Sequence, residues 1–513
     1  MSPNCVEWLY SDLAIQTVGA VPVPIYPSSS AEVTGQIAED SGAVLAVAAD
    51  APMAEMLALR GNLKKVVRID GELQDWITGE PSPALMGRIE ERAHNLSPED
   101  LATIVYTSGT TGEPKGVMLT QRAITDMVDS SLEAFPVGAD DIVLSFLPYA
   151  HIFERVSGTY LGIRCGATGY ISRGMDSLLQ DLGEVRPSLM CAVPRMFEKM
   201  HAAVMAQVDR AAPRRQALFH WALRRGSRGG PLRTIAERLV LKPLRAHLTG
   251  GRVRFFVSGG APLAEPIEEF FWAAGIPVLQ GWGMTETSSG GTANTLEQHR
   301  VGSVGRPLPG VEIRIAADGE VLIKSPGNMK GYYRNAKATR EILDRDGWLH
   351  TGDLGELDPD GFLRIIDRKK DLIKTAGGKY VAPQPLEARL QEDPLIERAV
   401  VIGDRRPYVT ALIVPDWEAV KGRLGVSGQP GELIHDDRVM DAIQKRVDEV
   451  NAGLGSWETV KCFSLLAQDF SEERGEMTPS LKVRRRVVQD SYQEQVEEMY
   501  SRRGGPELRA STV

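Results

Sequence analysis

Four cysteines are all that this chain of 513 residues contains, and no two of them form a C-x-x-C pair. Their wide spacing argues against a disulfide framework or a cysteine-based zinc site and favours a reducing compartment. No run of 18 apolar residues occurs, so the sequence predicts no membrane-spanning helix. The N-terminus also lacks a basic region followed by an apolar core, so no secretion signal is expected.

The chain has no excess of positive charge, because 59 Lys and Arg stand against 68 Asp and Glu, a net charge of −9. This balance argues against a general nucleic-acid-binding protein, and no nucleic-acid partner is expected. The composition is otherwise that of a globular protein, with 42% apolar and 25% charged residues. A chain of this length is too long to pack around one hydrophobic core, so two or more domains are expected.

The most informative stretch that is present is YTSGTTGEPKG at 106–116, which directly follows an apolar run. Its glycines let backbone N–H groups approach a ligand closely, and its hydroxyls and ammonium suit phosphate oxygens. The sequence therefore predicts a phosphate clamp made by Thr107, Ser108, Gly109, Thr110, Thr111, Gly112 and Lys115. It is not a Walker loop, because Lys115 is followed by Gly116 and not by Ser or Thr. A plain surface loop of the same composition is the alternative.

Further motifs follow in order along the chain: QGWGMTE at 280–286, GWLHTGD at 347–353, DRKKD at 367–371, GGK at 377–379 and PSLK at 479–482. Together they resemble the signatures of the adenylate-forming (AMP-binding) superfamily over essentially the whole chain. Three other segments resemble its long-chain fatty acyl-CoA synthetase branch: LPYAHIFERV at 147–156, VPRMFEK at 193–199 and VSGGAPL at 257–263.

The resemblance implies a nucleotide site in which eight residues hold the adenosine: Gly260, Ala261, Pro262, Gly281, Trp282, Gly283, Asp353 and Arg368. Most relatives carry Tyr where this chain has Trp282, and either ring covers an adenine face. Asp353 is suited to accept both ribose hydroxyls, and Arg368 is suited to donate to the same ribose.

The resemblance also implies the residues that carry the chemistry. Thr285 is expected to contact the α-phosphate, and Glu286 to bind Mg²⁺, which prefers oxygen ligands. Lys482 is expected to bridge the carboxylate and the α-phosphate, because a point-charge ammonium suits an oxyanion that changes shape in the transition state. His151 is open to two roles, base or pocket wall; we expect it and Phe153 to line the substrate pocket, since the carboxylate is already ionised.

Alternating short β-branched runs and helical patterns up to about residue 280 predict α/β layers with a largely parallel sheet. Residues 301–325 predict a small β-subdomain. The predicted organisation is a large AMP-binding domain at 1–369 and a small, mobile α+β domain at 371–500, with a disordered tail at 501–513. By resemblance, Lys370 is the hinge.

Two glycines, Gly377 and Gly378, are expected to serve the second half-reaction, because they permit close approach of a pantetheine arm. The residues at 8–15 and 19–26 predict a helix and a strand that resemble elements well inside the family's large domain. The N-terminal portion of that domain is therefore expected to be shortened.

One segment is strongly basic although the chain as a whole is acidic. Residues 201–254 carry eleven Arg and one Lys but only two acidic residues, a net charge of +10. Mixed with apolar residues, such a segment is suited to an anionic membrane surface. The alternative is a helical excursion whose apolar face packs on its own domain. The expected location is cytoplasmic, with peripheral contact at the inner face of the membrane.

The predicted function is ATP-dependent activation of a long-chain fatty acid to acyl-AMP and its transfer to coenzyme A, with ATP, Mg²⁺ and CoA required. The class is an AMP-forming acid–thiol ligase. Two alternatives stay open at this stage: a fatty acyl-AMP ligase that loads a separate carrier protein, and a truncated form that binds lipid or nucleotide without turnover.

Overall fold

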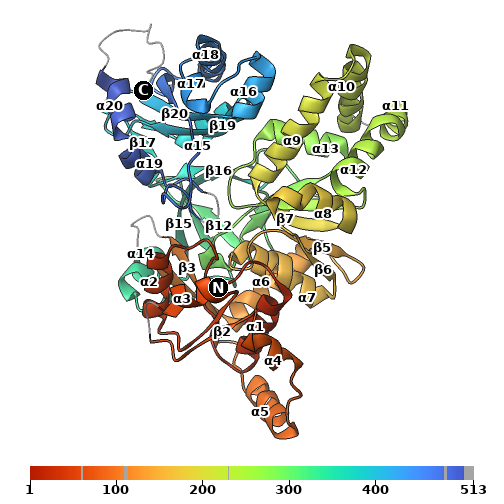
Figure 1. Cartoon of the computed structure of the whole chain (residues 1–513), viewed down its shortest axis with the longest axis vertical. Coiled ribbons are helices and arrows are strands. Elements are labelled where there is room, and N and C mark those ends of the chain that lie inside the picture. The colour runs from red at the N-terminus through yellow and green to blue at the C-terminus, as the bar shows by residue number, and fades with distance from the viewer. Residues whose placement is uncertain (59–61, 109–113, 229, 479–481, 502–513) are drawn as a thin grey trace. The chain divides into compact units, whose positions relative to one another are not determined.

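The computed structural model describes residues 1–58, 62–108, 114–228, 230–478 and 482–501 (Figure 1). They form an α/β protein, as predicted, and the chain divides into two compact units. The first comprises Met1–Ala316, Val321–Thr351 and Leu357–Arg364; the second comprises Ala317–Glu320, Gly352–Glu356 and Ile365–Val513. From residue 502 onward the predicted tail lies outside the described residues.

A seven-stranded sheet forms the centre of the first unit, in the order β11-β10-β9-β8-β7-β5-β6. Its parallel part consists of β5 (Ile142–Ser145), β6 (Thr168–Ile171), β7 (Leu189–Ala192), β8 (Phe255–Ser258) and β9 (Val278–Trp282). Two short antiparallel strands continue it, β10 (Thr292–Ala293) and β11 (Arg306–Pro307). Strands that are buried on both faces consist of nearly continuous apolar residues. This pattern is why β5, β7 and β8 could be predicted from the sequence.

Helices cover both faces of this sheet. Successive residues of a strand point to opposite faces, and both sets are apolar here, so each face has a surface on which helices pack. Val143, Leu189 and Phe255 join one buried cluster with residues of α6 (Gln121–Ala134) and of the π-helix η1 (Phe153–Tyr160). Their neighbours Leu144, Met190 and Phe256 join a second cluster with α8 (Leu178–Val185), α9 (Pro194–Asp209) and α13 (Glu265–Ala274). Because β5 to β9 run parallel, their carboxyl ends meet at one edge of the sheet, which is the usual ligand site of such a fold.

The predicted strand at 19–26 is wrong. These residues are extended but carry no strand assignment, and their backbone reaches β3 at isolated points, such as the hydrogen bond from the Ile104 N–H to the Pro22 carbonyl at 3.2 Å. Pro22 and Pro24 lack the N–H groups that a ladder needs. The predicted helix is present as α1 (Val6–Thr17). The elements that follow are α2 (Ala31–Ser41), β1 (Leu45–Ala48), α3 (Ala51–Ala58), β2 (Lys65–Arg68), α4 (Glu72–Thr78) and α5 (Pro83–His94).

A second sheet, in the order β14-β4-β3, carries the glycine- and hydroxyl-rich stretch. Strands β3 (Leu101–Ser108) and β4 (Pro114–Thr120) pair antiparallel, and Thr107 lies opposite Lys115. Strand β14 (Gly331–Tyr332) pairs with β4, so Tyr332 lies opposite Val117. Residues 109–113 lie outside the described residues. The clamp residues that are described therefore sit at the ends of two paired strands.

The basic segment is helical, as the sequence predicts. It contains the end of α9 and then α10 (Pro213–Arg228), α11 (Pro231–Ala236), the π-helix η3 (Glu237–Leu241) and α12 (Lys242–Thr249). Part of its apolar side is core, since Phe219 and Leu241 are buried. No helix in the described ranges combines the length and the apolar character that crossing a membrane requires.

The β-subdomain expected from 301–325 begins with β12 (Glu312–Ile315) and β13 (Glu320–Lys324), which belong to a four-stranded sheet with β15 (Leu349–Leu357) and β16 (Leu363–Arg368). Further short elements are α7 (Leu161–Cys165), η2 (Met175–Ser177), η4 (Thr285–Thr287) and α14 (Ala336–Ile342).

The second unit has its own three-stranded sheet, β19 (Ile396–Ile402), β20 (Val409–Pro415) and β21 (Val460–Leu465), in that order. A separate hairpin is formed by β17 (Ile373–Lys374) and β18 (Tyr380–Val381). Its helices are α15 (Pro383–Gln391), α16 (Trp417–Leu424), α17 (Pro430–Leu433), α18 (Asp437–Asn451), α19 (Arg485–Ser491) and α20 (Gln493–Ser501). Buried residues of α18, such as Val439 and Ile443, pack with the sheet, which gives this unit a core of its own.

Candidate active site

The turn after β8 presents the first predicted adenine segment. Gly260 has φ +85°, a left-handed conformation that glycine adopts without strain. The N–H of Gly259 donates to the Ala192 carbonyl at 3.2 Å, which ties the turn to the end of β7. Ala261 and Pro262 are exposed beyond it. The structure therefore puts this turn at the carboxyl edge of the sheet.

The adjacent strand β9 ends in the QGWGMTE motif. Gly283 has no room for a side chain, because a Cβ there would lie 1.9 Å from the carbonyl oxygen of Ser289. The Met284 N–H donates to Oγ1 of Thr287 at 3.1 Å, and Ser288 and Ser289 have φ of 52° and 82°. Positive φ in non-glycine residues is costly and persists only where the surroundings fix it. The chain thus turns sharply here to present Thr285 and Glu286.

Glu286 is buried and is joined to Lys115 through an aromatic ring that the sequence analysis missed. The hydroxyl of Tyr332 donates to Oε1 of Glu286 at 2.7 Å. Nζ of Lys115 lies 5.3 Å from the centroid of the same ring, within cation–π range. The expected metal ligand and the expected phosphate lysine therefore share one neighbour. The only sequence signal for Tyr332 is that a buried tyrosine hydroxyl needs a partner.

Three residues of the predicted phosphate clamp lie at the facing ends of β3 and β4: Thr107, Ser108 and Lys115. Thr107 and Lys115 are cross-strand neighbours, and Ser108 is the last residue of β3. The remaining predicted clamp residues lie outside the described residues: Gly109, Thr110, Thr111 and Gly112.

The site suits a magnesium ion that a nucleotide brings. No group of three or more His, Cys, Asp or Glu within the described ranges is arranged to hold a metal. Glu286 offers a single buried carboxylate, of which Oε1 is used by Tyr332. Mg²⁺ typically takes one or two carboxylates together with substrate phosphates and waters, so this donor set fits it.

The predicted pocket residues lie next to the adenine segment. The ring of Phe153 lies against Gly259, since a Cβ on that glycine would be 3.2 Å from two ring carbons. Nδ1 of His151 accepts the Phe153 N–H at 3.2 Å, and its ring makes an edge contact with Tyr26 at 6.5 Å between centroids. The hydrogen bond uses the lone pair of Nδ1, which favours the wall role of His151 over the base role.

In the second unit, the two predicted ribose residues contact each other. Nε of Arg368 lies 3.0 Å from Oδ1 of Asp353, and the Asp353 side chain is only 7% exposed. The carboxylate therefore has its charge compensated by a guanidinium that is itself 43% exposed. Next to it, burial raises the pKa of Asp367 to about 6.

The predicted hinge and acceptor residues lie on turns of the second unit. Lys370 is exposed, directly after Lys369, whose N–H donates to the Gly352 carbonyl at 2.8 Å. Gly377 and Gly378 form the tip of the β17–β18 hairpin, and Gly378 has φ +75°. A Cβ on Gly378 would meet nothing within 4 Å, so the tip is open to a ligand.

Lys482 follows the undescribed residues 479–481 and is anchored by its backbone. Its N–H donates to Oγ1 of Thr478 at 3.1 Å, and its carbonyl accepts the Thr478 N–H at 2.8 Å. Met477 and Val483 pair just outside these bonds. The exposed Lys482 side chain is thus carried on a backbone that two hydrogen bonds hold to Thr478.

Two family models match most of this chain. Residues 1–333 match the family described as AMP-binding enzyme, and residues 370–504 match the AMP-binding enzyme C-terminal domain. The chain belongs to this family of AMP-binding enzymes.

Three relatives show how far the similarity extends. Long-chain-fatty-acid–CoA ligase FadD15 of Mycobacterium bovis is 37% identical over 97% of this chain and 86% of that protein. Long-chain-fatty-acid–CoA ligase 5 of Rattus norvegicus is 32% identical over 97% and 79%. The peroxisomal long chain acyl-CoA synthetase 7 of Arabidopsis thaliana is 31% identical over 97% and 77%.

Solved structures agree in fold. The anthranilate CoA ligase AuaEII in complex with anthranoyl-AMP has a TM-score of 0.74 at 19% identity, covering 96% of this chain and 86% of that chain. ATP-bound MatB from Rhodopseudomonas palustris has a TM-score of 0.71 at 24% identity, covering 96% and 88%. These likenesses establish the predicted fold, a large N-terminal domain followed by a smaller C-terminal one.

Proposed function

We propose that this chain is an AMP-forming long-chain fatty acid–CoA ligase that uses ATP, Mg²⁺ and CoA. The proposal is supported by the contacts that join Glu286, after β9, to Tyr332 and Lys115 of the second sheet, in a chain whose relatives bear that name. A metal ligand and a phosphate-binding cation beside one another suit a reaction at the phosphates of a nucleotide.

In the first half-reaction, a carboxylate oxygen of the fatty acid attacks the α-phosphorus of ATP. The bond from that phosphorus to the bridging oxygen breaks, and pyrophosphate leaves. Mg²⁺, when bound, neutralises charge on the phosphates, and Glu286 would hold it. Lys115 would neutralise the departing phosphates, and Thr285 and Lys482 would bind the α-phosphate and the carboxylate.

In the second half-reaction, the sulfur of CoA attacks the acyl carbon of the adenylate. The carbon–oxygen bond to AMP breaks, AMP leaves, and the thiol proton passes to solvent. We assign the open hairpin tip at Gly377 and Gly378 to the acceptor arm. The ribose would bind Asp353 and Arg368, and the small domain, 371–500, would swing about Lys370 against the large domain, 1–369.

The test is pyrophosphate release from ATP by the purified chain, with fatty acids from acetate to stearate, with and without CoA. The proposal predicts release that is greatest with long chains and needs CoA for turnover. A single stoichiometric burst that CoA leaves unchanged would identify an acyl-AMP ligase. A folded protein that binds ATP but releases no pyrophosphate would identify a binding form without turnover.

We further propose that the basic segment contacts an anionic membrane, which would make the protein peripheral at a cytoplasmic membrane face. Four large apolar side chains in this segment are exposed by 40–60%: Leu218, Leu232, Ile235 and Leu239. The same segment also carries exposed basic residues: Arg210, Arg214, Arg215, Arg224, Arg233, Arg238, Lys242 and Arg252. A helical segment that exposes both apolar side chains and cations suits the boundary between lipid headgroups and acyl chains.

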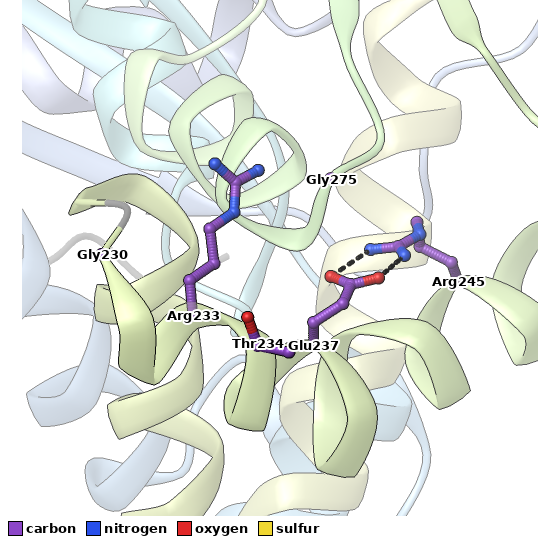
Figure 2. Close-up of a pocket in the computed structure, with 6 residues that line it drawn as sticks. All are labelled: Gly230, Arg233, Thr234, Glu237, Arg245 and Gly275. Carbon is purple, nitrogen blue, oxygen red and sulfur yellow. Dashed lines mark hydrogen bonds and ion pairs between the residues drawn. The ribbon is translucent and has the colours of Figure 1, made fainter.

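A cavity of about 470 Å³ is lined by residues of this segment and by Gly275 (Figure 2). Glu237 and Arg245 are paired on one side of it, and Arg245 also donates to the Ala274 carbonyl at 2.9 Å. Arg233 extends on the other side, apart from that pair (Figure 2). The paired residues are structural, so Arg233 is the cation here that is suited to a lipid phosphate.

Flotation with vesicles of anionic and of neutral lipid tests the membrane proposal. Binding to anionic vesicles should weaken strongly above physiological salt, because charges farther apart than about 8 Å are then screened. The double variant Arg233→Gln/Arg238→Gln should bind less than the wild type. Arg88→Gln/Arg92→Gln, on the exposed helix α5, is the matched control. No binding at low salt would refute the proposal.

A further inference from the structure

Glu268, on the first turn of α13, is a buried acid with an unusual set of contacts. Its side chain has no exposure to solvent. Oε2 accepts two hydrogen bonds, from Nε2 of Gln280 at 2.5 Å and from the Gly302 N–H at 3.2 Å. Oε1 has no hydrogen-bond partner. The carboxyl group is therefore fixed on one side and unsatisfied on the other.

Gln280 carries these contacts to the nucleotide site. It lies on β9, directly before Gly281, and is 5% exposed. While its amide nitrogen donates to Glu268, its Oε1 accepts the N–H of Leu263 at 3.1 Å. Leu263 follows the turn that contains Gly260. The side-chain amide of Gln280 thus links the two predicted adenine segments. Gln280 lies directly before Gly281–Gly283, and its partner Leu263 lies directly after Gly260–Pro262.

Stability of the fold does not explain why a carboxyl group is buried here. Burial raises the pKa of Glu268 to about 7, because desolvation disfavours the charged carboxylate. An unsatisfied buried polar group lowers the stability of the fold, and a well-packed apolar side chain at the same position would avoid this loss. A position that keeps such a group requires an explanation beyond packing.

We propose that Glu268 is a positioning residue of the nucleotide site. Acting through Gln280, it sets the spacing between the turn at Gly260–Pro262 and the segment at Gly281–Gly283, so that the two fit the faces and edges of an adenine ring. The inference rests on the proposed function, which places adenine between these segments.

The chain offers a graded set of variants. Glu268→Gln keeps an acceptor oxygen for Gln280 and Gly302 and places its NH₂ where Oε1 has no partner. Glu268→Ala removes the acceptor. Gln280→Met keeps the length of the side chain but breaks the link to Leu263. Glu269→Ala, the exposed neighbour on α13, is the matched control.

Two measurements separate positioning from a general structural role. The first is the equilibrium affinity for MgATP by titration calorimetry, which needs no turnover. The second is steady-state kinetics with ATP, fatty acid and CoA varied in turn. Glu268→Ala and Gln280→Met should each weaken MgATP affinity and raise the KM for ATP about tenfold, equivalent to about 1.4 kcal/mol. The KM for CoA should stay unchanged, and Glu268→Gln should restore affinity to within about twofold of the wild type.

Clear results would overturn the inference. Glu268→Ala or Gln280→Met that melts at a lower temperature, yet binds MgATP like the wild type, shows a purely structural link. If Glu268→Ala does not fold, Gln280→Met decides. Loss of affinity in Glu268→Gln equal to that in Glu268→Ala would also refute it. Failure of the proposed function is distinct, because it would show as normal MgATP binding without pyrophosphate release in the wild type.

Discussion

The hydroxyl of Tyr332 donates to a carboxylate oxygen of Glu286, 46 residues earlier in the chain, at 2.7 Å. The bond leaves Oε2 of Glu286 as the oxygen available to a cation. Because the same ring lies under the ammonium of Lys115, it spaces a phosphate-binding lysine from a metal-binding carboxylate. A tyrosine outside every recognised motif thereby becomes part of the proposed reaction centre.

Tyr332→Phe should lower fatty-acid-dependent pyrophosphate release by roughly 10- to 100-fold and raise the Mg²⁺ concentration needed for half-maximal rate. A hydrogen bond to a charged group contributes about 1.5–3 kcal/mol, and here it orients the metal ligand. The measurement is initial rate against Mg²⁺ at saturating ATP. Tyr333→Phe, the next residue, is the control. An unchanged Mg²⁺ dependence in Tyr332→Phe would contradict the assignment.

Lys482→Ala should reduce adenylation by about 10²- to 10³-fold, the usual loss when one group that stabilises transition-state charge is removed. Transfer of the acyl group from chemically prepared acyl-AMP to CoA should survive, since the lysine is assigned to the first half-reaction only. Comparing the two half-reactions separately tests this. Lys461→Ala, an exposed lysine on β21, serves as the reference. Equal loss in both halves would mean that Lys482 supports the fold.

Glu154→Gln should change the dependence of stability on pH. The side chain is 1% exposed, neither carboxylate oxygen has a hydrogen-bond partner, and burial raises its pKa from 4.5 to about 8. The folded protein holds this proton more tightly than the unfolded chain. The contribution of Glu154 to the free energy of unfolding is therefore fully present below about pH 4.5 and falls as the pH rises to about 8. Above that pH it stays constant, after a total loss of roughly 4–5 kcal/mol.

The variant cannot ionise, so it should match the wild type at pH 5 and melt at a higher temperature at pH 8. Scanning calorimetry from pH 5 to 8 measures both. Glu133→Gln, on the exposed side of α6, should keep the wild-type profile. Parallel profiles for Glu154→Gln and the wild type would show that Glu154 is ionised inside the fold.

Asp12→Ala should destabilise the first unit by about 3–5 kcal/mol, because it leaves the Arg155 guanidinium buried without a counter-charge. Arg155 is fully buried and pairs with Asp12, and it also donates to Oγ1 of Thr103 and to the Tyr160 hydroxyl, each at 2.8 Å. Urea unfolding measures the loss. The double variant Asp12→Ala/Arg155→Met should recover part of it, and Glu7→Ala is the control on α1. A double variant that adds both losses would contradict the pairing.

Much of the site was predictable because its parts are local. The α/β class followed from buried strand runs such as Phe255–Ser258, which read as apolar wherever both faces are covered. Motif identity and order gave the family, which the matches at 1–333 and 370–504 confirm. The strand predicted at 19–26 failed, because two prolines remove the donors that β-pairing needs.

The sequence by itself determined the family, the α/β class and the basic helical segment, since each depends on residue types at short spacing. Only the tertiary structure decided that Tyr332 meets Glu286, that Glu268 reaches Leu263 through Gln280, and that Arg155 meets Asp12, 143 residues away. Such contacts join side chains whose separation along the chain carries no periodic signal. They form because buried polar groups must find partners once the sheet and its helices bring them together.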